Sequence, residues 1–572
     1  MAALIGALDN YTSTQIGENG HLEHKWSDDI REQIVQLSFQ LTRTKDVPSL
    51  AYPTAKLISE LRTQFTNGNI LKEEYVEYMV LLYKMIGQTR DIIDGKGEYA
   101  LSYMLLNVWS SSVDADLANF ALKQFVLNDN ADIHPYGSWK DIKYLYKYSL
   151  TSNNLVSYGI KLMNEQLRRD VDSPNPSLAA KWVPREKSHF AALFSVMAVD
   201  YFPKYLETAK TESSKIKALL KTKMEYRKLI SGLNKKLDTA QIKQCANTWS
   251  ELVPEKQTSI TMHLQKQAFL NLKKSGEQRS FAEDRVKCAE TFAEFAAKAS
   301  RNECTIKGKR IGLNDFTKEA INLIIYNKKN GPEAQILNAQ WTNNSMQTGA
   351  LGKMVAMVDV SGSMDGDPMN AAIALGIRVA EKSMLGKRVL TFSASPTWIN
   401  LDKCANFVEM VDVIKHDSNW GMNTNFYAAL NMMLDAIVAN KLKPEDVEDM
   451  VLAIFSDMQI DDAHDNKSGK METIMERIEN RYAEEGNKLW GKPFKAPHIL
   501  FWNLRSTSGF PTLSLQKNAS MMSGFSPALL NIFCDEGLEA LQTCTPWSLF
   551  KKSLDNPRYK VLEDEMRRFL AQ

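Results

Sequence analysis

The sequence has little cysteine and no long apolar run. Its six cysteines lie far apart and form no CxxC pair, which argues against both a disulfide scaffold and a thiolate zinc site. No apolar stretch approaches the length of about 18 residues that a membrane-spanning helix needs. The first residues, MAALIGALDNYTST, carry no basic residue ahead of a short apolar stretch, so they do not resemble a secretory signal. We therefore expect a soluble intracellular protein of the cytoplasm.

The common catalytic motifs are also missing. No P-loop occurs, because Gly352-Lys353 is followed by Met354, and neither GxSxG nor HExxH is present. The eight histidines are scattered, and none is tied by sequence to a nucleophile. The sequence thus favours a protein that is not an enzyme.

Charge is balanced overall but uneven along the chain. The net charge is +2, yet residues 201–350 carry 26 Lys and Arg against 15 Asp and Glu, an excess of 11. Such a block would attract phosphate backbones if it lay on one face; the alternative is a solvated helix face balanced by acidic neighbours. The candidate RNA contacts within the block are Lys221, Lys223, Arg227, Lys228, Lys235 and Lys236.

The first half of the chain is predicted to be helical. Over residues 28–345 apolar positions recur at spacings of three and four, with polar breaks between the segments. This pattern indicates an all-α helical-repeat array, similar to stacked helix pairs, although no clean repeat period is found. An N-terminal segment (1–27) precedes it, and the Asn- and Gly-rich stretch 328–353 is interpreted as a connection to the next domain.

After Lys353 the pattern changes to short apolar runs separated by helical stretches. The runs are predicted strands, and their alternation with helices indicates a doubly wound, Rossmann-like α/β domain over residues 350–535. A helical tail (536–572) follows and would pack on either domain. The four predicted strands are 353–360, 388–394, 450–456 and 498–504.

Oxygen-bearing side chains stand where these strands end. The first strand runs into Asp359-Val-Ser361-Gly-Ser363, Thr424 stands just before a helix, and the third strand ends in Asp457. In open α/β sheets ligands gather beyond the carboxyl ends of the strands. Two carboxylates and three hydroxyls form a hard-oxygen set that suits Mg²⁺ or Mn²⁺. Because few carboxylates neutralise the ion, it would accept an acidic group from a partner.

Other interpretations of these residues remain open. Asp359 and Asp457 would otherwise cap helix starts. An EF-hand fails, because with Asp359 at position one Met364 replaces the required Gly and Asn370 the required Glu. A metal-dependent hydrolase would need a general base from the Asp461–Asp465 loop. That loop holds Asp461, Asp462, His464 and Asp465 and is interpreted as a polar loop or, alternatively, a second metal site.

DVSGSM, the Thr of GMNT and the Asp of FSDMQ together resemble the metal-ion-dependent adhesion site (MIDAS) of von Willebrand factor A (vWA) domains. The resemblance implies that Ser361, Ser363 and Thr424 ligate the ion directly or nearly so. It also implies that Asp359 and Asp457 act mainly through bound water.

The helical half with a C-terminal vWA domain resembles the TROVE–vWA (Ro-type) proteins, and most closely an uncharacterised sister family of them. In Ro-type proteins a ring of helices closed by the vWA domain binds RNA, so the resemblance implies RNA binding here. The segments that carry it are TRDIIDGKGE (89–98), HPYGSWKDI (134–142), KWVPRE (181–186), YRKLISGLNKKL (226–237) and SGFSPALL (523–530).

Candidate RNA contacts in these segments each have a structural alternative. Arg90 and Lys96 would bind phosphate or pair locally with Asp91 and Glu98. Trp139 with Lys140 would stack on a base and hold its phosphate, or Trp139 would pack between helices. Lys181, beside Trp182, has the same two interpretations.

The leading hypothesis is a non-enzymatic binding protein. A basic helical array would capture RNA or a ribonucleoprotein, and the vWA domain would dock an acidic partner residue through Mg²⁺. The alternative is a protein–protein scaffold without a nucleic-acid role, and a lesser one is the metal-dependent hydrolase.

Overall fold

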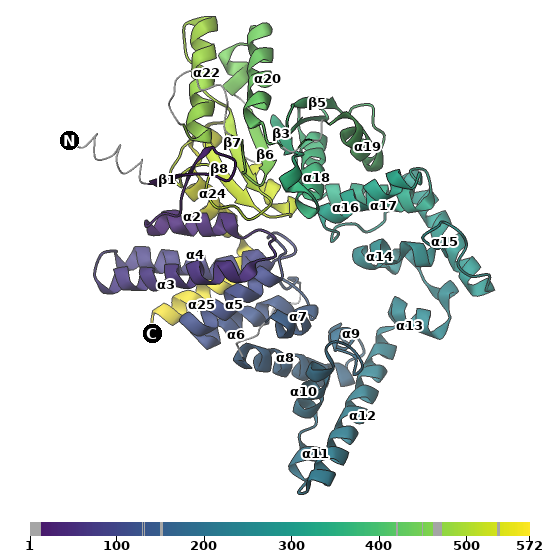
Figure 1. Ribbon diagram of the computed structural model, residues 1–572. Helices are drawn as coiled ribbons and strands as arrows, with labels where there is room; N and C mark the ends of the chain where they lie inside the picture. Colours follow the sequence, from purple (N-terminus) through teal and green to yellow (C-terminus); the bar gives the residue numbers. More distant parts are fainter. Residues whose placement is uncertain are drawn as a thin grey trace.

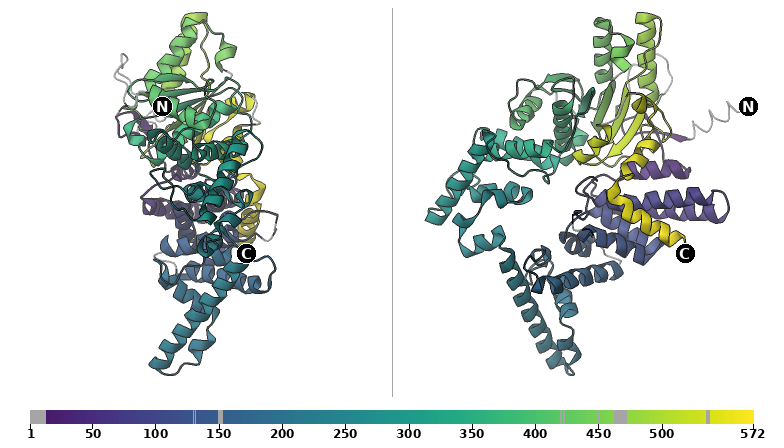
Figure 2. Two further views of the ribbon diagram at one scale, coloured as in Figure 1. Left: turned by 90° about the vertical axis from the view of Figure 1, so that its right-hand side faces the viewer. Right: turned by 180° about the vertical axis from the view of Figure 1, so that it is seen from behind.

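The protein forms a ring of helices that is closed by a domain containing a sheet (Figure 1). The N-terminal part is helical and the C-terminal part is an α/β domain with mostly parallel strands, as the sequence predicts. Seen from its side in Figure 2, the ring is narrow. A computed structural model describes residues 13–128, 130, 132–148, 153–418, 421, 423–448, 450–461, 472–534 and 538–572.

In the helical part, each helix packs mainly against helices that are close to it in the chain; α5 packs on α6, for example, and α10 on α12. Short polar side chains cap several helices: Asp114 accepts hydrogen bonds from the first turn of α6, and Thr211 forms a capping box at α12. The helices are α2 (Ile30–Gln40), α3 (Ala51–Thr66), α4 (Lys72–Arg90), α5 (Ala100–Ser112), α6 (Ala115–Val126), α7 (Lys140–Tyr148), α8 (Asn153–Asp172), α9 (Ala179–Trp182), α10 (Ala191–Tyr201), α11 (Lys204–Glu207), α12 (Glu212–Leu237), α13 (Ala240–Ala246), α14 (Ser259–Phe269), α15 (Glu283–Ser300), α16 (Leu313–Ile325) and α17 (Pro332–Ser345), with short 3-10 turns η1 (Val47–Leu50), η2 (Trp249–Glu251) and η3 (Pro254–Lys256).

The sheet has six strands in the order β5-β4-β3-β6-β7-β8. All neighbours are parallel except β5, which runs antiparallel to β4 at one edge. The four predicted strands are confirmed as β3, β4, β6 and β7. The strands are β3 (Met354–Asp359), β4 (Arg388–Phe392), β5 (Thr397–Asn400), β6 (Val451–Ser456), β7 (His498–Asn503) and β8 (Ala519–Ser523).

Both faces of the sheet are buried. Along β3, Val355 and Met357 belong to one apolar core, whereas Ala356 and Val358 belong to another. The first core also contains residues of α2 to α10 and α12, and the second contains residues of α16, α17 and α18, so the sheet joins two separately packed regions. The remaining helices are α18 (Asp367–Lys382), α19 (Phe407–Asp417), α20 (Phe426–Ala439), α21 (Pro444–Glu448), α22 (Ile474–Trp490), α23 (Leu538–Thr543), α24 (Pro546–Leu554) and α25 (Lys560–Leu570), with 3-10 turns η4 (Gly362–Met364), η5 (Pro527–Phe533) and η6 (Pro557–Tyr559).

Five elements depart from the sequence prediction. The predicted connection 328–353 contains α17, which Pro332 begins and whose Gln340 and Trp341 are buried; buried contacts outweigh its Asn-rich composition. The strands β5 and β8 were not predicted. Within the N-terminal segment, β1 (Thr14–Ile16) and β2 (Leu22–His24) form a hairpin that pairs through isolated bridges with the α/β domain at Asp461, Thr473 and Phe510.

The helical tail packs on both parts of the molecule. Helix α24 contacts β8 and α4, and α25 lies along α4. Gly87 of α4 permits this approach, because a Cβ atom there would lie 2.7 Å from Leu562 Cδ1. The tail therefore ties the first helices of the ring to the end of the chain.

Contacts at both ends of the helical part close the ring. Helix α2 packs against β8 and α24, whereas α16 and α17 pack against α18 and α19. Arg310 also donates a hydrogen bond to the Ile92 carbonyl at 3.2 Å, which joins the two ends directly. None of the described helices combines the length and apolarity that crossing a membrane requires.

Candidate functional site

Three loops meet at the carboxyl edge of the sheet and form what we call the strand-end site (Asp359, Ser361, Ser363, Thr424 and Asp457). In the loop after β3, Asp359 is fully buried. Its carboxylate accepts hydrogen bonds from the Ser361 N–H at 2.9 Å and from Ser456 Oγ at 2.6 Å. The Ser361 and Ser363 hydroxyl oxygens lie 3.1 Å apart. Asp359 thus orders the loop and holds the two hydroxyls side by side.

Thr424 enters the site from the segment that precedes α20. Its N–H donates to Asp461 Oδ2 at 2.7 Å, and the Asp461 N–H donates to the Thr424 carbonyl at 3.1 Å. A bridge between Ser361 and Gly421 joins this segment to the first loop. Thr424 is buried, and its Oγ1 has no hydrogen-bond partner among the described residues. The backbone is thus fixed while the hydroxyl stays unused.

Asp457 follows β6 and is also fully buried. Its Oδ1 accepts from the Gln459 N–H at 3.2 Å, whereas its Oδ2 has no hydrogen-bond partner among the described residues. The next residue, Met458, has a φ of +63°. Such a left-handed conformation costs a non-glycine residue about 1–3 kcal/mol and is commonest at functional sites. The tight turn presents the Asp457 carboxylate to the site.

The two carboxylates of the site disfavour each other's charge. Burial and, secondly, the nearby Asp457 charge raise the pKa of Asp359 to about 7. Burial also raises the pKa of Asp457, and the nearby Ser363 hydroxyl offsets part of that rise. A divalent cation between these groups would favour their ionised forms. The electrostatics therefore suit a cation site.

The structure brings the five predicted residues to one edge of the sheet. They supply two carboxylates and three hydroxyls, the oxygen chemistry that Mg²⁺ and Mn²⁺ prefer. Within the described residues no group of three or more His, Cys, Asp or Glu is placed to hold a metal, so a site here depends on the hydroxyls. Of the acidic loop after β6, Asp461 positions Thr424; Asp462, His464 and Asp465 lie outside the described residues.

Three further residues support the site: Ser456 and Arg505, which were not predicted, and Asp461, which the sequence analysis placed only in an acidic loop. Ser456 and Asp461 act by hydrogen bonds to Asp359 and Thr424. Arg505, just beyond β7, donates to the Ser363 carbonyl, and its Nη1 lies 3.8 Å from Asp457 Oδ2. Arg505 stands two residues past the end of β7, whereas Asp457 directly follows β6, so the residue that directly follows each strand does not identify Arg505.

Arg90 and Lys96, two predicted RNA contacts, lie in the interior. The Arg90 guanidinium makes two hydrogen bonds to Asp141, at 2.6 and 2.9 Å. Lys96 donates to the carbonyls of Ser38 and Leu41 and to Ser523 Oγ. Neither side chain is available to RNA in this structure.

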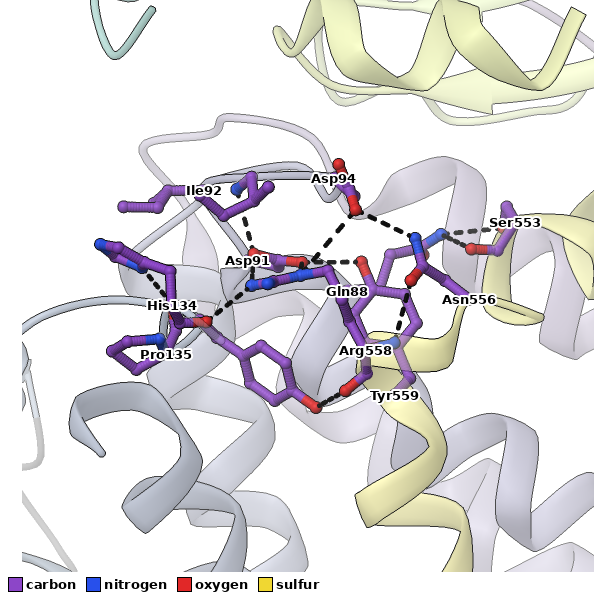
Figure 3. A network of polar contacts seen from close by, with 12 residues as sticks. Gln88, Asp91, Ile92, Asp94, His134, Pro135, Ser553, Asn556, Arg558 and Tyr559 are labelled. Carbon is purple, nitrogen blue, oxygen red and sulfur yellow. Dashed lines mark hydrogen bonds and ion pairs between the residues drawn. The ribbon is translucent and has the colours of Figure 1, made fainter. Parts of the chain in front are cut away.

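The alternative prediction, that Arg90 pairs with Asp91 and Lys96 with Glu98, is also wrong, because both carboxylates pair with other residues. Asp91 pairs with Arg558 of the tail at 2.6 and 2.7 Å, within the network drawn in Figure 3. Glu98 pairs with Arg43 at 3.0 Å. Gly95 makes the fold of this loop possible, because a Cβ atom there would lie 2.1 Å from the Gln88 carbonyl oxygen. The segment 89–98 is therefore a structural junction.

Three other lysines form a cluster with aromatic rings, which we call the aromatic–lysine cluster (Lys140, Lys143, Lys181, Tyr144 and Trp182). Lys140 Nζ lies 4.8 Å from the Tyr144 ring centre, and Lys143 Nζ lies 5.3 Å from that of Trp182. All three lysines are half-buried, and none has an acidic partner among the described residues. Burial lowers the pKa of Lys143 and of Lys181. Trp139, by contrast, is buried.

The predicted basic contacts on α12 are mostly exposed but partly occupied. Arg227 pairs with Glu186, and Lys228 Nζ lies 3.3 Å from Glu225. Lys236 donates to the Val171 carbonyl at 2.7 Å, and Lys221 lies over the Tyr205 ring. Lys223 and Lys235 have no ion pair within the part of the chain that is described. The helix presents positive charge that its neighbours neutralise in part.

Comparison with known proteins finds similarity without an assigned activity. A family model described as a domain of unknown function (DUF7788) matches residues 353–559, which span the sheet and α24. The chain is also similar to the uncharacterized protein L728 of Acanthamoeba polyphaga mimivirus. The two are 28% identical over 491 residues, which cover 81% of this chain and 77% of the viral protein. An alignment of that length includes residues of both the helical part and the α/β domain of this chain.

Proposed function

We propose that this chain is a non-enzymatic binding protein. It docks an acidic side chain of a protein partner through Mg²⁺, or Mn²⁺, held at the strand-end site. The observation that carries the proposal is the pair of buried oxygens, Thr424 Oγ1 and Asp457 Oδ2, that lack hydrogen-bond partners among the described residues. Buried polar atoms are nearly always satisfied, so two unsatisfied oxygens at one site point to a ligand.

The residue types favour docking of a partner over a closed structural metal site. Asp359, Ser361, Ser363, Thr424 and Asp457 would hold the ion. Since only two of them are carboxylates, the ion supplies, when bound, a coordination position for an outside carboxylate. Ser363 is partly exposed whereas the other four are buried, so a partner would approach from the Ser363 side.

Titration with Mg²⁺ alone tests the metal site. Thr424→Val removes the unused hydroxyl and keeps the side chain's shape, so we expect Mg²⁺ affinity to fall about tenfold or more. The free energy of unfolding should change little, because that hydroxyl makes no hydrogen bond to any described residue. Isothermal titration calorimetry and urea unfolding of the full chain measure both quantities.

A matched variant controls for the loss of a buried hydroxyl. Thr317 in α16 is also buried, and its Oγ1 also has no hydrogen-bond partner among the described residues. Thr317→Val should therefore bind Mg²⁺ like the unaltered chain. Equal Mg²⁺ affinity in Thr424→Val and the unaltered chain would contradict the proposed site.

A second proposed function is binding of RNA, or of a ribonucleoprotein, by the helical part. The observation that favours it is the aromatic–lysine cluster, in which half-buried ammonium groups stand beside aromatic rings and lack acidic partners among the described residues. Stacked bases and neighbouring phosphates satisfy such a surface. The resemblance to TROVE–vWA proteins supports the same proposal.

The alternative is a scaffold in which the helical part binds only proteins. RNA capture neutralises phosphates and weakens steeply as salt rises, whereas a protein scaffold need not show that dependence. Sequencing of nucleic acid that co-purifies with the chain separates the two. Absence of RNA at low salt would favour the scaffold.

A further inference from the structure

Arg505 stands at a solvent-exposed edge of the strand-end site. Its side chain is 46% exposed, whereas that of Asp457 beside it is fully buried. Ser363, whose carbonyl accepts from Arg505, is the other partly exposed member. A ligand that approaches the site from the Ser363 side therefore meets the Arg505 guanidinium.

The backbone around Arg505 is held in place from the helical part. The Arg505 N–H donates to Asn503 Oδ1 at 3.1 Å, and Asn503 Nδ2 donates to the Phe39 carbonyl at 3.0 Å. Two residues further on, Thr507 exchanges hydrogen bonds with the Gln40 side chain. Such bracing positions a binding group in advance and lowers the entropic cost of using it.

The guanidinium retains donors for an outside group. Nη1 is the atom that contacts Ser363 and Asp457. The Nε and Nη2 groups make no hydrogen bond to any described residue. Arginine presents these donors as a planar fork that matches the two oxygens of a carboxylate.

We infer that Arg505 is a specificity-determining residue that binds the acidic side chain docked at the strand-end site, and that the partner presents a run of acidic residues there. This inference rests on the proposed function. One carboxylate meets the metal ion, and Arg505 binds its second oxygen or the carboxylate beside it. The same positive charge repels the metal ion near Asp457, so Arg505 favours the ligand at some cost to the affinity for Mg²⁺.

Fluorescence anisotropy with a fluorescein-labelled hexaglutamate peptide tests the inference on the full chain. In Mg²⁺ the unaltered chain should bind the peptide, and EDTA should abolish binding. Arg505→Gln should weaken binding about tenfold or more, because it removes a charge-assisted, forked contact. Arg505→Lys keeps the positive charge but not the planar fork of donors, so its affinity for the peptide should lie between those of the unaltered chain and Arg505→Gln. Arg505→Gln should bind Mg²⁺, as measured by calorimetry, with an affinity equal to or higher than that of the unaltered chain.

Arg388→Gln is the matched control. It removes one positive charge at the start of β4, the opposite end of the sheet, where Arg388 pairs with Asp402. Peptide binding should be unchanged in this variant. A loss equal to that of Arg505→Gln would mean that net charge alone attracts the peptide, and it would overturn the inference.

The remaining outcomes separate the inference from the proposed function. Peptide binding that EDTA abolishes but Arg505→Gln leaves intact overturns the inference and supports the metal site. Binding that survives EDTA overturns both. Mg²⁺ binding without any binding of hexaglutamate overturns the acidic ligand, and Arg505-dependent binding that is tighter for a phosphoserine peptide assigns the site to phosphate instead.

Discussion

Lys96 shows how far the interior of this protein departs from the sequence-level expectation for a lysine. Its ammonium group is buried between α2, β8 and the 91–98 loop, where it donates to two carbonyls and a hydroxyl. Burial lowers the pKa of Lys96 from 10.5 to about 7. The residue therefore belongs to the junction of the ring, and a loss of RNA binding on its substitution would not identify a contact.

The lowered pKa makes stability depend on pH. Between pH 7 and about 10.5 the unfolded chain holds the Lys96 proton more tightly than the folded chain, so stability contributed by this site rises with pH, by up to about 1.4 kcal/mol per unit. Below pH 7 both states are protonated and the dependence vanishes. In urea unfolding at pH 7, 8 and 9, the free energy of unfolding of the unaltered chain should rise with pH relative to that of Lys96→Met. Parallel pH profiles of the two chains would contradict the prediction.

Sequence reasoning at this scale selected side chains whose position is set locally and missed those whose partners are distant. Asp359 and Asp457 each follow a predicted strand, and parallel strands bring such residues together. For Arg90 the sequence predicted an ion pair with its neighbour Asp91, but the actual partner is Asp141, 51 residues away. Arg505 lies near Asp457 only because β7 and β6 are neighbours, and no local pattern states that order.

Among the elements, the strands show what a local pattern can and cannot predict. β3, β4, β6 and β7 are mostly apolar and almost entirely buried, the pattern expected of parallel strands. β5 has only four residues at a sheet edge, and β8 reads ASMMS without a β-branched residue. Both are strands because a neighbour pairs with them, and this is tertiary information.

Helices α7 and α9 carry the element-scale prediction for RNA, with Lys140 and Lys143 on α7 and Lys181 on α9. Replacing Lys140, Lys143 and Lys181 with Gln should weaken binding of a labelled oligouridylate. The slope of log affinity against log salt should fall by about 2, since each phosphate contact on single-stranded RNA contributes about 0.7. Fluorescence anisotropy over a salt series measures it.

A second triple variant controls for the change in net charge. Lys56, Lys273 and Lys298 each pair with a glutamate four residues away on the sequence. Their replacement with Gln removes the same charge at sites that are already neutralised, so the salt slope should stay close to that of the unaltered chain. If the slope of log affinity against log salt is equal in the unaltered chain and both triple variants, RNA does not bind at the aromatic–lysine cluster.

At the scale of the whole molecule, ring closure depends on contacts between distant parts of the chain. Gln40 hydrogen-bonds to Thr507, and Arg558 to Asp91, each across 467 residues. The sequence predicted both halves of the protein, but it left open whether the helices form a ring or an open arc, because periodicity contains no information on such pairs. Shared apolar cores decide it: one core runs from α2 through one face of the sheet to α25.

Cleavage of the ring at one point should therefore leave it assembled. Asp238, between α12 and α13, is exposed and has a left-handed backbone conformation. A protease site inserted there would divide the chain into fragments that share that apolar core, so we expect them to co-elute on size-exclusion chromatography after cleavage, at the volume of the uncleaved insertion variant. Separate elution of the two fragments would contradict the shared core.

The position of the tail also has a consequence during synthesis. Helix α4 emerges from the ribosome about 470 residues before α25, which packs along it at Gly87 and Leu562. At roughly 5–20 residues per second, this surface waits on the order of half a minute or longer for its cover. The nascent chain must keep this face of α4 soluble for that time, until α25 has been translated.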